Sequence, residues 1–417
     1  MSQPFKRWLG FLGLIAASAV LVSACGGGDD NSNNGGAASN GSSDAGVSLS
    51  DGNAANTAAI TVDSGVSKVI NIPTVNVKIC VPGTSNCQIV INVLVDTASY
   101  GVRLVGNAVS GVLGNLPQTM VNGTPLAECG KFVSSYTWGS VRTVDLSIGT
   151  EQASSLPVQI IGDLSTTNAP IACVSGREPV NSASDLGANG ILGIGPAPYD
   201  CGARCVTSTS AVYNNYYACQ NGNANCTVAL VPLAHQVANP VHRFPIDNNG
   251  VIVQMPKISD NGQANATGRL TFGIGTQSNN PLAASAMLTS TTSGDVSAAF
   301  LNRTVTAFFD TGSNAYFFND SSQIPCSRNT EFYCPPSPVE YTATLTGQNG
   351  TTASVSMPVA NANALFSTPG TFAFNNIAGA FGDAGWLDIG LPYFYDRAIY
   401  IGMDRTAIGG SGPYVAF

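Results

Sequence analysis

The chain has 417 residues, of which 10% are charged, and its 24 acidic residues outnumber its 16 basic ones. Nucleic acid and anionic membrane surfaces are therefore not expected as partners, because both would be repelled. Gly, Thr, Ser, Val and Asn are abundant and apolar residues rarely follow a helical spacing, which is typical of a β-rich exported protein. The length exceeds one ordinary core and indicates two lobes.

Residues 1–24 have the features of a secretory signal peptide. Two basic residues precede an apolar stretch that has no acidic residue and is too short to be preferred as a membrane span. The segment ends Val22-Ser23-Ala24-Cys25, which resembles the lipobox of bacterial lipoproteins. The resemblance implies cleavage before Cys25 and attachment of lipid, palmitate included, to that residue. Gly26 rather than Asp follows, so the sorting rule of Gram-negative lipoproteins points to the outer membrane, at its periplasmic face or at the cell surface. The alternative is an ordinary signal peptide with an incidental Cys.

A low-complexity segment of Gly, Asn, Ser, Ala and Asp occupies residues 25–57. It has almost nothing to bury and predicts a flexible tether that reaches about 30 Å by random-coil scaling. Two β-lobes are expected beyond it, an N-terminal lobe at residues 58–258 and a C-terminal lobe at residues 259–417.

Eleven cysteines occur in the chain, and without Cys25 an even ten remain. In an exported chain this number favours disulfides, and the close spacings predict that neighbours pair in order. A zinc site is the alternative. It is disfavoured because there is no Cys-x-x-Cys and because His235 and His242, the only histidines, lie away from the cysteine pairs. We therefore expect no metal.

Short apolar runs separated by Gly, Asn and Pro fill the first lobe and predict strands. Residues 89–105 read IVINVLVDTASYGVRLV and contain the turn Asp96-Thr97-Ala98-Ser99. A glycine-rich step, ANGILGIG, follows at residues 188–195. Residues 196–244 then hold four cysteines and a cluster of Tyr residues, and we expect a surface insertion stapled by disulfides.

The second half repeats this order. Residues 305–318 read VTAFFDTGSNAYFF, so that Asp310-Thr311-Gly312-Ser313 lies between two apolar runs, 214 residues after the first Asp turn. Strands, an Asp turn, further strands and an apolar step ending in Gly recur in both halves, which is the signature of a duplicated lobe. The apolar flanks predict that each carboxylate is held inside a buried sheet, where it needs a partner. A pseudo-two-fold axis between the halves would bring Asp96 and Asp310 together.

Two carboxyl groups that meet in this way would share one proton, because two negative charges within about 3 Å cannot both persist. Such a pair can activate water for attack on an amide without a metal or an organic cofactor. A serine hydrolase is excluded, since the chain has no Gly-x-Ser-x-Gly elbow. The Gly-x-Gly sequences lack the third glycine of a dinucleotide loop, so no nucleotide cofactor is expected.

With these motifs in this order, the chain resembles the bilobal, pepsin-like aspartic peptidases over about residues 60–417. The resemblance implies an all-β, pepsin-like (acid protease) fold with two related β-lobes and a cleft between them. It implies one catalytic Asp from each lobe, Asp96 and Asp310. The chain also resembles bacterial putative lipoproteins of a family catalogued only as a domain of unknown function, which adds no activity.

The resemblance also implies supporting roles around the two Asp residues. Two threonines match residues that lock the turns across the axis by hydrogen bonds, and two serines match residues that bond the outer carboxylate oxygens. These residues are Thr97, Thr311, Ser99 and Ser313, and Gly312 completes the intact Asp-Thr-Gly-Ser of the second motif.

In this family a hairpin flap that carries a Tyr closes over the substrate. The sequence SSYTWGS, residues 134–140, resembles that flap, and its Tyr136 lies 40 residues after Asp96. Tyr136 takes the place of the flap Tyr, with Trp138 beside it. The alternative is a Tyr that only packs on a sheet.

Three residues depart from the family pattern. Ala98 replaces the Gly of the first motif and would be strained if that position needs a positive φ. Arg103 stands in the place of the Trp that steadies the flap Tyr, where a cation would favour two ionised carboxylates unless it points to solvent. Ile389-Gly390 resembles part of the family's second apolar-apolar-Gly motif, whose first copy resembles Ile191-Leu192-Gly193. Asp388, just before it, occupies a position that is usually apolar, and it is either a buried third carboxylate or a sign that this motif has been aligned wrongly.

The sequence thus predicts an aspartic endopeptidase anchored in the bacterial envelope, monomeric, most active at acid pH and acting on polypeptides. The alternative is a binding or structural lipoprotein that keeps the scaffold but has lost catalysis through Ala98 and Arg103, with a protein or glycan in its cleft.

Overall fold

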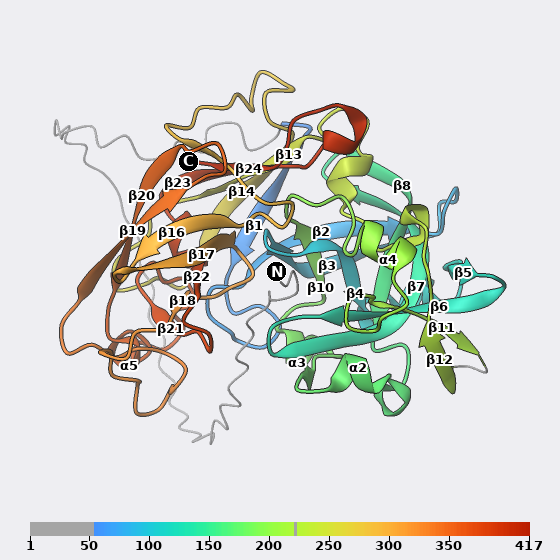
Figure 1. Ribbon diagram of the computed structural model, residues 1–417, viewed down its shortest axis with the longest axis horizontal. Helices are drawn as coiled ribbons and strands as arrows, with labels where there is room; N and C mark the ends of the chain where they lie inside the picture. Colours follow the sequence, from blue (N-terminus) through green and yellow to red (C-terminus); the bar gives the residue numbers. More distant parts are fainter. Residues whose placement is uncertain (1–53, 221–222) are drawn as a thin grey trace, which may run out of the picture.

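The computed structural model describes residues 54–220 and 223–417. The predicted signal peptide, Cys25 and most of the predicted tether lie outside these residues. Strands dominate the described chain, and its helices are single turns of three to five residues (Figure 1). Within the described residues, no helix is both long enough and apolar enough to cross a membrane.

The strands of the first half, in chain order, are β1 (Thr57–Val62), β2 (Pro73–Cys80), β3 (Cys87–Asp96), β4 (Tyr100–Val105), β5 (Met120–Val121), β6 (Thr124–Lys131), β7 (Ser135–Ile148), β8 (Glu151–Ile161), β9 (Glu178–Pro179), β10 (Gly190–Ile194), β11 (Tyr216–Gln220), β12 (Asn225–Val228) and β13 (Gly250–Met255). Those of the second half are β14 (Ala266–Phe272), β15 (Met287–Thr289), β16 (Val296–Phe300), β17 (Arg303–Asp310), β18 (Tyr316–Phe318), β19 (Val339–Thr346), β20 (Thr352–Val359), β21 (Ala378–Ala380), β22 (Trp386–Gly390), β23 (Arg397–Gly402) and β24 (Tyr414–Ala416).

The α-helical turns are α1 (Ser110–Leu113), α2 (Ile171–Val174), α3 (Ala183–Leu186), α4 (Ala203–Thr207) and α5 (Ala362–Leu365). The 3₁₀ turns are η1 (Gly106–Val109), η2 (Thr166–Asn168), η3 (Leu233–His235), η4 (Pro240–Arg243), η5 (Leu391–Phe394) and η6 (Thr406–Ile408).

Six strands of the first half close into a barrel. Hydrogen bonds run from β2 to β3, then to β10, β4, β8 and β7, and from β7 back to β2. The barrel is filled by Val, Ile and Leu side chains, because residues alternate between its inside and outside along each strand. Closure removes the unpaired edges that an open sheet would expose.

Seven strands of the second half form an open half-barrel in the order β20-β19-β16-β17-β22-β18-β21. Its outer strands alternate buried and exposed residues, as β19 does with the sequence VEYTATLT. A third group of strands joins the two bodies, since β1 pairs with β14, β14 with β13, and β13 with β23. The predicted all-β, two-lobed fold class is confirmed, and the exact domain boundary stays a prediction.

The predicted duplication appears as the same strand arrangement in both bodies. In the first, β10 lies between β3 and β4, parallel to one and antiparallel to the other. In the second, β22 lies between β17 and β18 in the same sense. The register places Gly193 opposite Asp96 and Gly390 opposite Asp310. Both glycines are required, because an added Cβ would lie 2.7 Å from the Gly101 oxygen in one case and 2.0 Å from the Ala315 oxygen in the other.

Five disulfides form among the described residues, and they pair neighbouring cysteines in order, as predicted. They are Cys80–Cys87, Cys129–Cys173, Cys201–Cys205, Cys219–Cys226 and Cys326–Cys334. Two of them staple the predicted insertion, whose strand β11 extends the sheet by pairing with β6. The insertion is therefore part of the first body.

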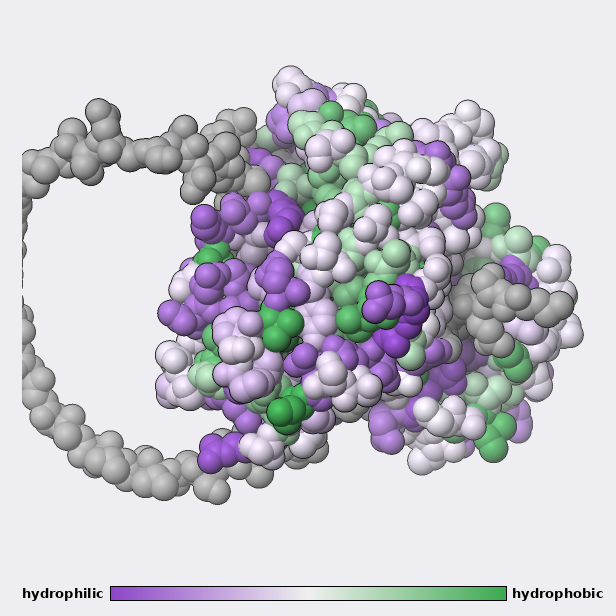
Figure 2. Space-filling view, turned by 60° about the vertical axis from the view of Figure 1, so that its left-hand side comes forward, coloured by the Kyte–Doolittle hydropathy of each residue, from purple (hydrophilic) through white to green (hydrophobic). Residues whose placement is uncertain are grey.

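Exposed large apolar residues are spread over several elements of the surface, with one close pair, Ile89 and Ile91, on β3. The most exposed of them among the described residues, Ile171, Ile408 and Ile89, belong to separate elements. Hydrophilic and hydrophobic residues are also intermixed on the face drawn in Figure 2. Scattered apolar residues of this kind are common on protein surfaces and do not by themselves indicate a binding site.

Candidate active site

The two Asp turns meet where the bodies touch. Asp96 ends β3 and Asp310 ends β17, and both side chains are almost fully buried, with exposed fractions of 0% and 1%. Each strand enters the turn from inside a sheet, so the apolar runs on either side carry the carboxylate into the interior. The prediction that each carboxylate is held inside a sheet is confirmed.

Hydrogen bonds lock the turns to each other. Thr97 Oγ1 donates to the Phe309 carbonyl at 3.0 Å and accepts from the Thr311 N–H at 3.0 Å. Thr311 Oγ1 donates to the Val95 carbonyl at 2.6 Å and accepts from the Thr97 N–H at 3.2 Å. The residues before and after each Asp are thus bonded to the opposite turn, so this frame sets the position of both carboxylates.

Each turn also bonds its own carboxylate. Asp96 Oδ1 accepts from the N–H groups of Ala98 at 2.8 Å and Ser99 at 3.1 Å, and the Ser99 hydroxyl donates to Oδ2 at 2.5 Å. In the second turn, the Gly312 N–H donates to Asp310 Oδ1 at 2.7 Å. These contacts hold both carboxyl groups in defined orientations.

Ala98 fits the first turn without strain. It is not among the residues with a positive φ, and its N–H makes the same bond to the carboxylate as that of Gly312 in the second turn. Its methyl group is buried in an apolar cluster that also contains Phe308 and Phe317 of the second body. The position does not need the conformational freedom of Gly, so the strain considered for Ala98 is absent.

Arg103 is buried and paired with two acids. Its side chain is 4% exposed, and Nη2 lies 2.5 Å from Glu128 Oε1 and 3.6 Å from Asp200 Oδ2. Burial lowers the pKa of Arg103, but the Glu128 and Asp200 carboxyls raise it by more. Arg103 therefore does not point to solvent; it is buried and forms an ion pair with Glu128, with Asp200 close by, an arrangement that the sequence did not predict.

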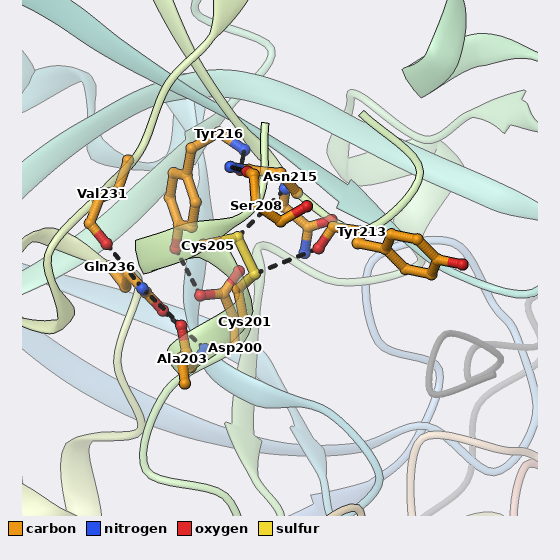
Figure 3. Close-up of a disulfide and its surroundings, with 12 residues drawn as sticks. Asp200, Cys201, Ala203, Cys205, Ser208, Tyr213, Asn215, Tyr216, Val231 and Gln236 are labelled. Carbon is orange, nitrogen blue, oxygen red and sulfur yellow. Dashed lines mark hydrogen bonds between the residues drawn. A yellow bond between two sulfur atoms is a disulfide. The ribbon is translucent and has the colours of Figure 1, made fainter. Parts of the chain in front are cut away.

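The second of these acids belongs to the insertion. Burial, and then repulsion by Glu128, raises the pKa of Asp200 well above its usual value, although Arg103 acts in the opposite direction. The Tyr216 hydroxyl donates to Asp200 Oδ1 at 2.5 Å beside the Cys201–Cys205 disulfide (Figure 3). Tyr216 in turn accepts the Val237 N–H at 2.7 Å. The bonds of Tyr216 thus hold Asp200 in place within the insertion, and the contact of Asp200 with Arg103 joins the insertion to the rest of the first body.

Asp388 is a buried third carboxylate beside Asp310. It is 1% exposed, and the Ser313 hydroxyl lies 2.6 Å from its Oδ2 and 3.0 Å from Asp310 Oδ2. The register of β22 against β17 sets Gly390 opposite Asp310, so the predicted apolar-apolar-Gly motif was aligned correctly. The first of the two alternatives for Asp388 is confirmed.

The predicted flap residues lie in an apolar cluster. β6 and β7 form a hairpin, in which Tyr136 and Trp138 share one face and pack with Tyr217 and the Cys129–Cys173 disulfide. The rings of Trp138 and Tyr217 meet edge to face at 5.7 Å. This placement matches the packing alternative for Tyr136, and its flap role stays a prediction without support from these contacts.

A different aromatic residue of the hairpin contacts Arg103. The Arg103 guanidinium lies 5.8 Å from the ring centre of Phe132, at the tip between the two strands. Sequence reasoning missed Phe132 because it searched for a Tyr. For Tyr136 and Trp138 the sequence did hold a signal, because side chains alternate along β7 and these two must face opposite to Thr137, whose hydroxyl donates to Gln159 Oε1 at 2.7 Å inside the body.

The described residues contain no group of three or more His, Cys, Asp or Glu side chains that could hold a metal ion.

Comparisons with known proteins place this geometry in context. A family model described as "Protein of unknown function (DUF3443)" matches residues 52–417. Among solved structures, the chain is similar to the aspartic proteinase from Irpex lacteus, with 14% identity, a TM-score of 0.46, and coverage of 86% of this chain and 97% of that chain. This likeness concerns the fold alone. No curated protein matches the chain.

Proposed function

The chain belongs to the family described as "Protein of unknown function (DUF3443)", and because this description assigns no activity, we propose the function from the site itself. The protein is an aspartic-type endopeptidase in which Asp96 and Asp310 activate water for attack on a peptide bond. The observation that supports this most is the set of crossed bonds through Thr97 and Thr311, which ties two buried Asp turns into one frame.

The chemistry requires one proton shared by the two carboxyls. The ionised partner takes a proton from water as the water oxygen attacks the peptide carbonyl. The protonated partner donates a hydrogen bond to the carbonyl oxygen as negative charge develops there. The proton gained from water then leaves with the amine when the C–N bond breaks, and the pair returns to its starting state. Bonds from Ala98, Ser99 and Gly312 keep the carboxyls oriented throughout.

The surroundings are compatible with this activity. Ala98 supplies the N–H that a Gly would supply, and it does so without backbone strain. Arg103 is paired with Glu128 at 2.5 Å, so its charge has a partner other than the dyad. The two residues that favoured an inactive scaffold therefore no longer weigh against catalysis.

The proposed setting is the bacterial envelope, with a lipid on Cys25, a body at the outer membrane, a polypeptide substrate and a monomeric state. The five disulfides of the described residues support export to an oxidising compartment. A Cys25→Ser variant tests the anchor. It should fail to incorporate a labelled palmitate and should leave the membrane fraction, whereas unchanged labelling and fractionation would refute lipidation at this residue.

Digestion of a denatured protein between pH 3 and 6 tests the activity. The wild type should release peptides, and Asp96→Asn and Asp310→Asn should each lower the rate by at least about 100-fold, the scale of general acid-base catalysis. Asp260→Asn is the matched control, because Asp260 is an exposed carboxylate of the second half. An inactive wild type, or dyad variants as active as this control, would refute the endopeptidase function. The alternative, a binding or structural lipoprotein, would then remain.

A further inference from the structure

Asp388 occupies a position that the fold fills with an apolar residue in the other body. It lies two residues before Gly390, and its counterpart two residues before Gly193 is Ile191, which is fully buried in an apolar cluster. A strand between two others in a covered sheet normally carries apolar side chains. A buried carboxyl there costs free energy unless it is hydrogen bonded. The repeated fold therefore does not account for this acid.

The hydroxyl of Ser313 links Asp388 to the proposed catalytic pair. Ser313 Oγ lies 2.6 Å from Asp388 Oδ2 and 3.0 Å from Asp310 Oδ2, and all three side chains are at least 99% buried. A serine hydroxyl carries one proton and has two acceptor lone pairs. It can give a full hydrogen bond to one carboxyl, and it must then meet the other with a lone pair.

The number of protons in the hydrogen-bonded chain Asp388–Ser313–Asp310 follows from that geometry. If both carboxyls were ionised, one of them would face an oxygen lone pair in a buried site, which is repulsive. Both contacts are favourable only when one carboxyl carries a proton and donates it to Ser313, while Ser313 donates its own proton to the second carboxyl. The hydrogen-bonded chain thus needs one carboxyl proton in addition to the proton of the Ser313 hydroxyl.

We propose that Asp388 is a positioning residue that stores this proton and exchanges it with Asp310 through Ser313. In one state Asp388 is neutral and donates to Ser313, which donates to an ionised Asp310. In the other, Asp310 is neutral and Asp388 is ionised. The two states interconvert when two protons move along the chain in the same direction, so no proton is gained or lost.

The proposal rests on the proposed endopeptidase for its functional meaning. As the pH rises, the site can lose its first proton from the Asp388 end and still keep one on the Asp96–Asp310 pair. The negative charge left on Asp388 also makes that last proton harder to remove. Asp388 therefore extends the active, singly protonated state of the pair toward neutral pH.

The elements packed against β22 carry these other titratable groups: Arg303 and Asp310 on β17, Tyr316 on β18, and Tyr393 on η5, whose ring centre lies 4.2 Å from the Arg397 guanidinium. β17 carries Arg303 as well as Asp310, and Arg303 donates to the Asn319 carbonyl. β18 carries Tyr316, whose hydroxyl reaches the Asn375 carbonyl at 3.4 Å. Asp96 lies across the seam on the turn that is locked to Asp310. The proton exchange is thus carried by carboxyls and one hydroxyl.

Infrared difference spectroscopy at pH 5, inside the range proposed for activity, tests the stored proton without any need for activity. An exposed Asp is mostly ionised at this pH, and other buried acids cancel in a difference between variants. In Asp388→Asn the amide can donate to Ser313, so the chain of hydrogen bonds persists without an acid proton. Wild type minus Asp388→Asn should show the carbonyl band of a protonated carboxyl, and wild type minus Asp260→Asn should show only the bands of an ionised one.

The pH dependence of kcat/KM tests the role in the reaction. For Asp388→Asn and for Asp388→Leu, the alkaline limb should move to lower pH by about one unit, because the stored proton and the nearby charge are gone. Asp388→Leu serves as the second variant if the Asn protein does not fold. Loss of only an ionised-carboxylate band in the spectrum, or an unmoved alkaline limb, would overturn the proposal. If the wild type cleaves nothing at any pH, the endopeptidase fails, and the spectrum alone decides on the proton of Asp388.

Discussion

The crossed bonds between the two turns make a strong prediction about Thr311→Val. Valine keeps the shape of threonine but has no hydroxyl, so two buried backbone groups lose their partners. These are the Val95 carbonyl, which accepts from Thr311 Oγ1 at 2.6 Å, and the Thr97 N–H, which donates to it at 3.2 Å. The change leaves the apolar packing of the seam in place, so its effect reports on the lock itself.

The magnitude follows from the cost of unpaired buried groups. Each orphaned donor or acceptor costs about 1–3 kcal/mol, so two of them should lower the free energy of unfolding by about 2–6 kcal/mol. Thr97→Val removes the equivalent bonds to the Phe309 carbonyl and the Thr311 N–H and should cost a similar amount. Both threonines hold the same two turns together. The double variant should therefore lose less free energy of unfolding than the sum of the two single losses, by at least about 0.5 kcal/mol.

Urea denaturation with the disulfides intact measures these free energies. Thr342→Val is the matched control, since Thr342 is exposed on β19 and valine has a high propensity for strands. Its effect should stay within about 0.5 kcal/mol. If Thr311→Val unfolds at the same urea concentration as this control, or if the two seam variants add fully, the turns are not locked by these bonds and the argument for a fixed dyad fails.

Three further predictions concern residues around the site. Ala98→Gly should lower the free energy of unfolding by about 1–2 kcal/mol in urea, because it adds backbone freedom where no positive φ is needed and removes a buried methyl group. It should not raise peptidase activity; a severalfold gain would show that the methyl group does obstruct the turn. Arg103→Met should cost about 3–5 kcal/mol by leaving two buried acids without their cation, and adding Glu128→Gln should recover part of this; a loss below about 1 kcal/mol would contradict the buried cluster. Burial and the neighbouring Asp247 carboxyl raise the pKa of Glu151 to about 7, so its stabilising contribution is full below about pH 4.5 and is lost as the pH rises through 7; the stability of wild type relative to Glu151→Gln should fall between pH 5 and pH 8, and an equal pH dependence of both proteins would exclude this linkage.

The sequence predicted the centre of the molecule because its signals there are local. An Asp-Thr turn between two apolar runs fixes a strand end, and Gly193 and Gly390 mark the strands that must pass close to those turns. Disulfides between neighbouring cysteines are equally local, since the spacing itself limits the choice of partners. Repetition of such signals in both halves then predicts how the halves relate.

The surroundings of Arg103 could not be predicted in the same way. Its partners Glu128 and Asp200 come from β6 and from the insertion, and only the folded chain brings them together. The sequence suggested that Arg103 lies near the dyad or points to solvent. The observed outcome, a buried Arg in an ion pair, depends on contacts between distant segments of the chain. Phe132 was missed for a related reason, because its role comes from touching Arg103 and not from its type.

The difference between the two turns is the part of the site that duplication cannot explain. Both bodies provide the same strand arrangement and the same crossed threonine bonds, so the backbone treats Asp96 and Asp310 alike. The side chains do not, because Ser313 serves both Asp310 and Asp388. A buried acid in place of an apolar residue weakens a fold more often than it stabilises it. Its presence in one body only is therefore understandable as a requirement of proton placement, which a symmetric pair of turns cannot provide by itself.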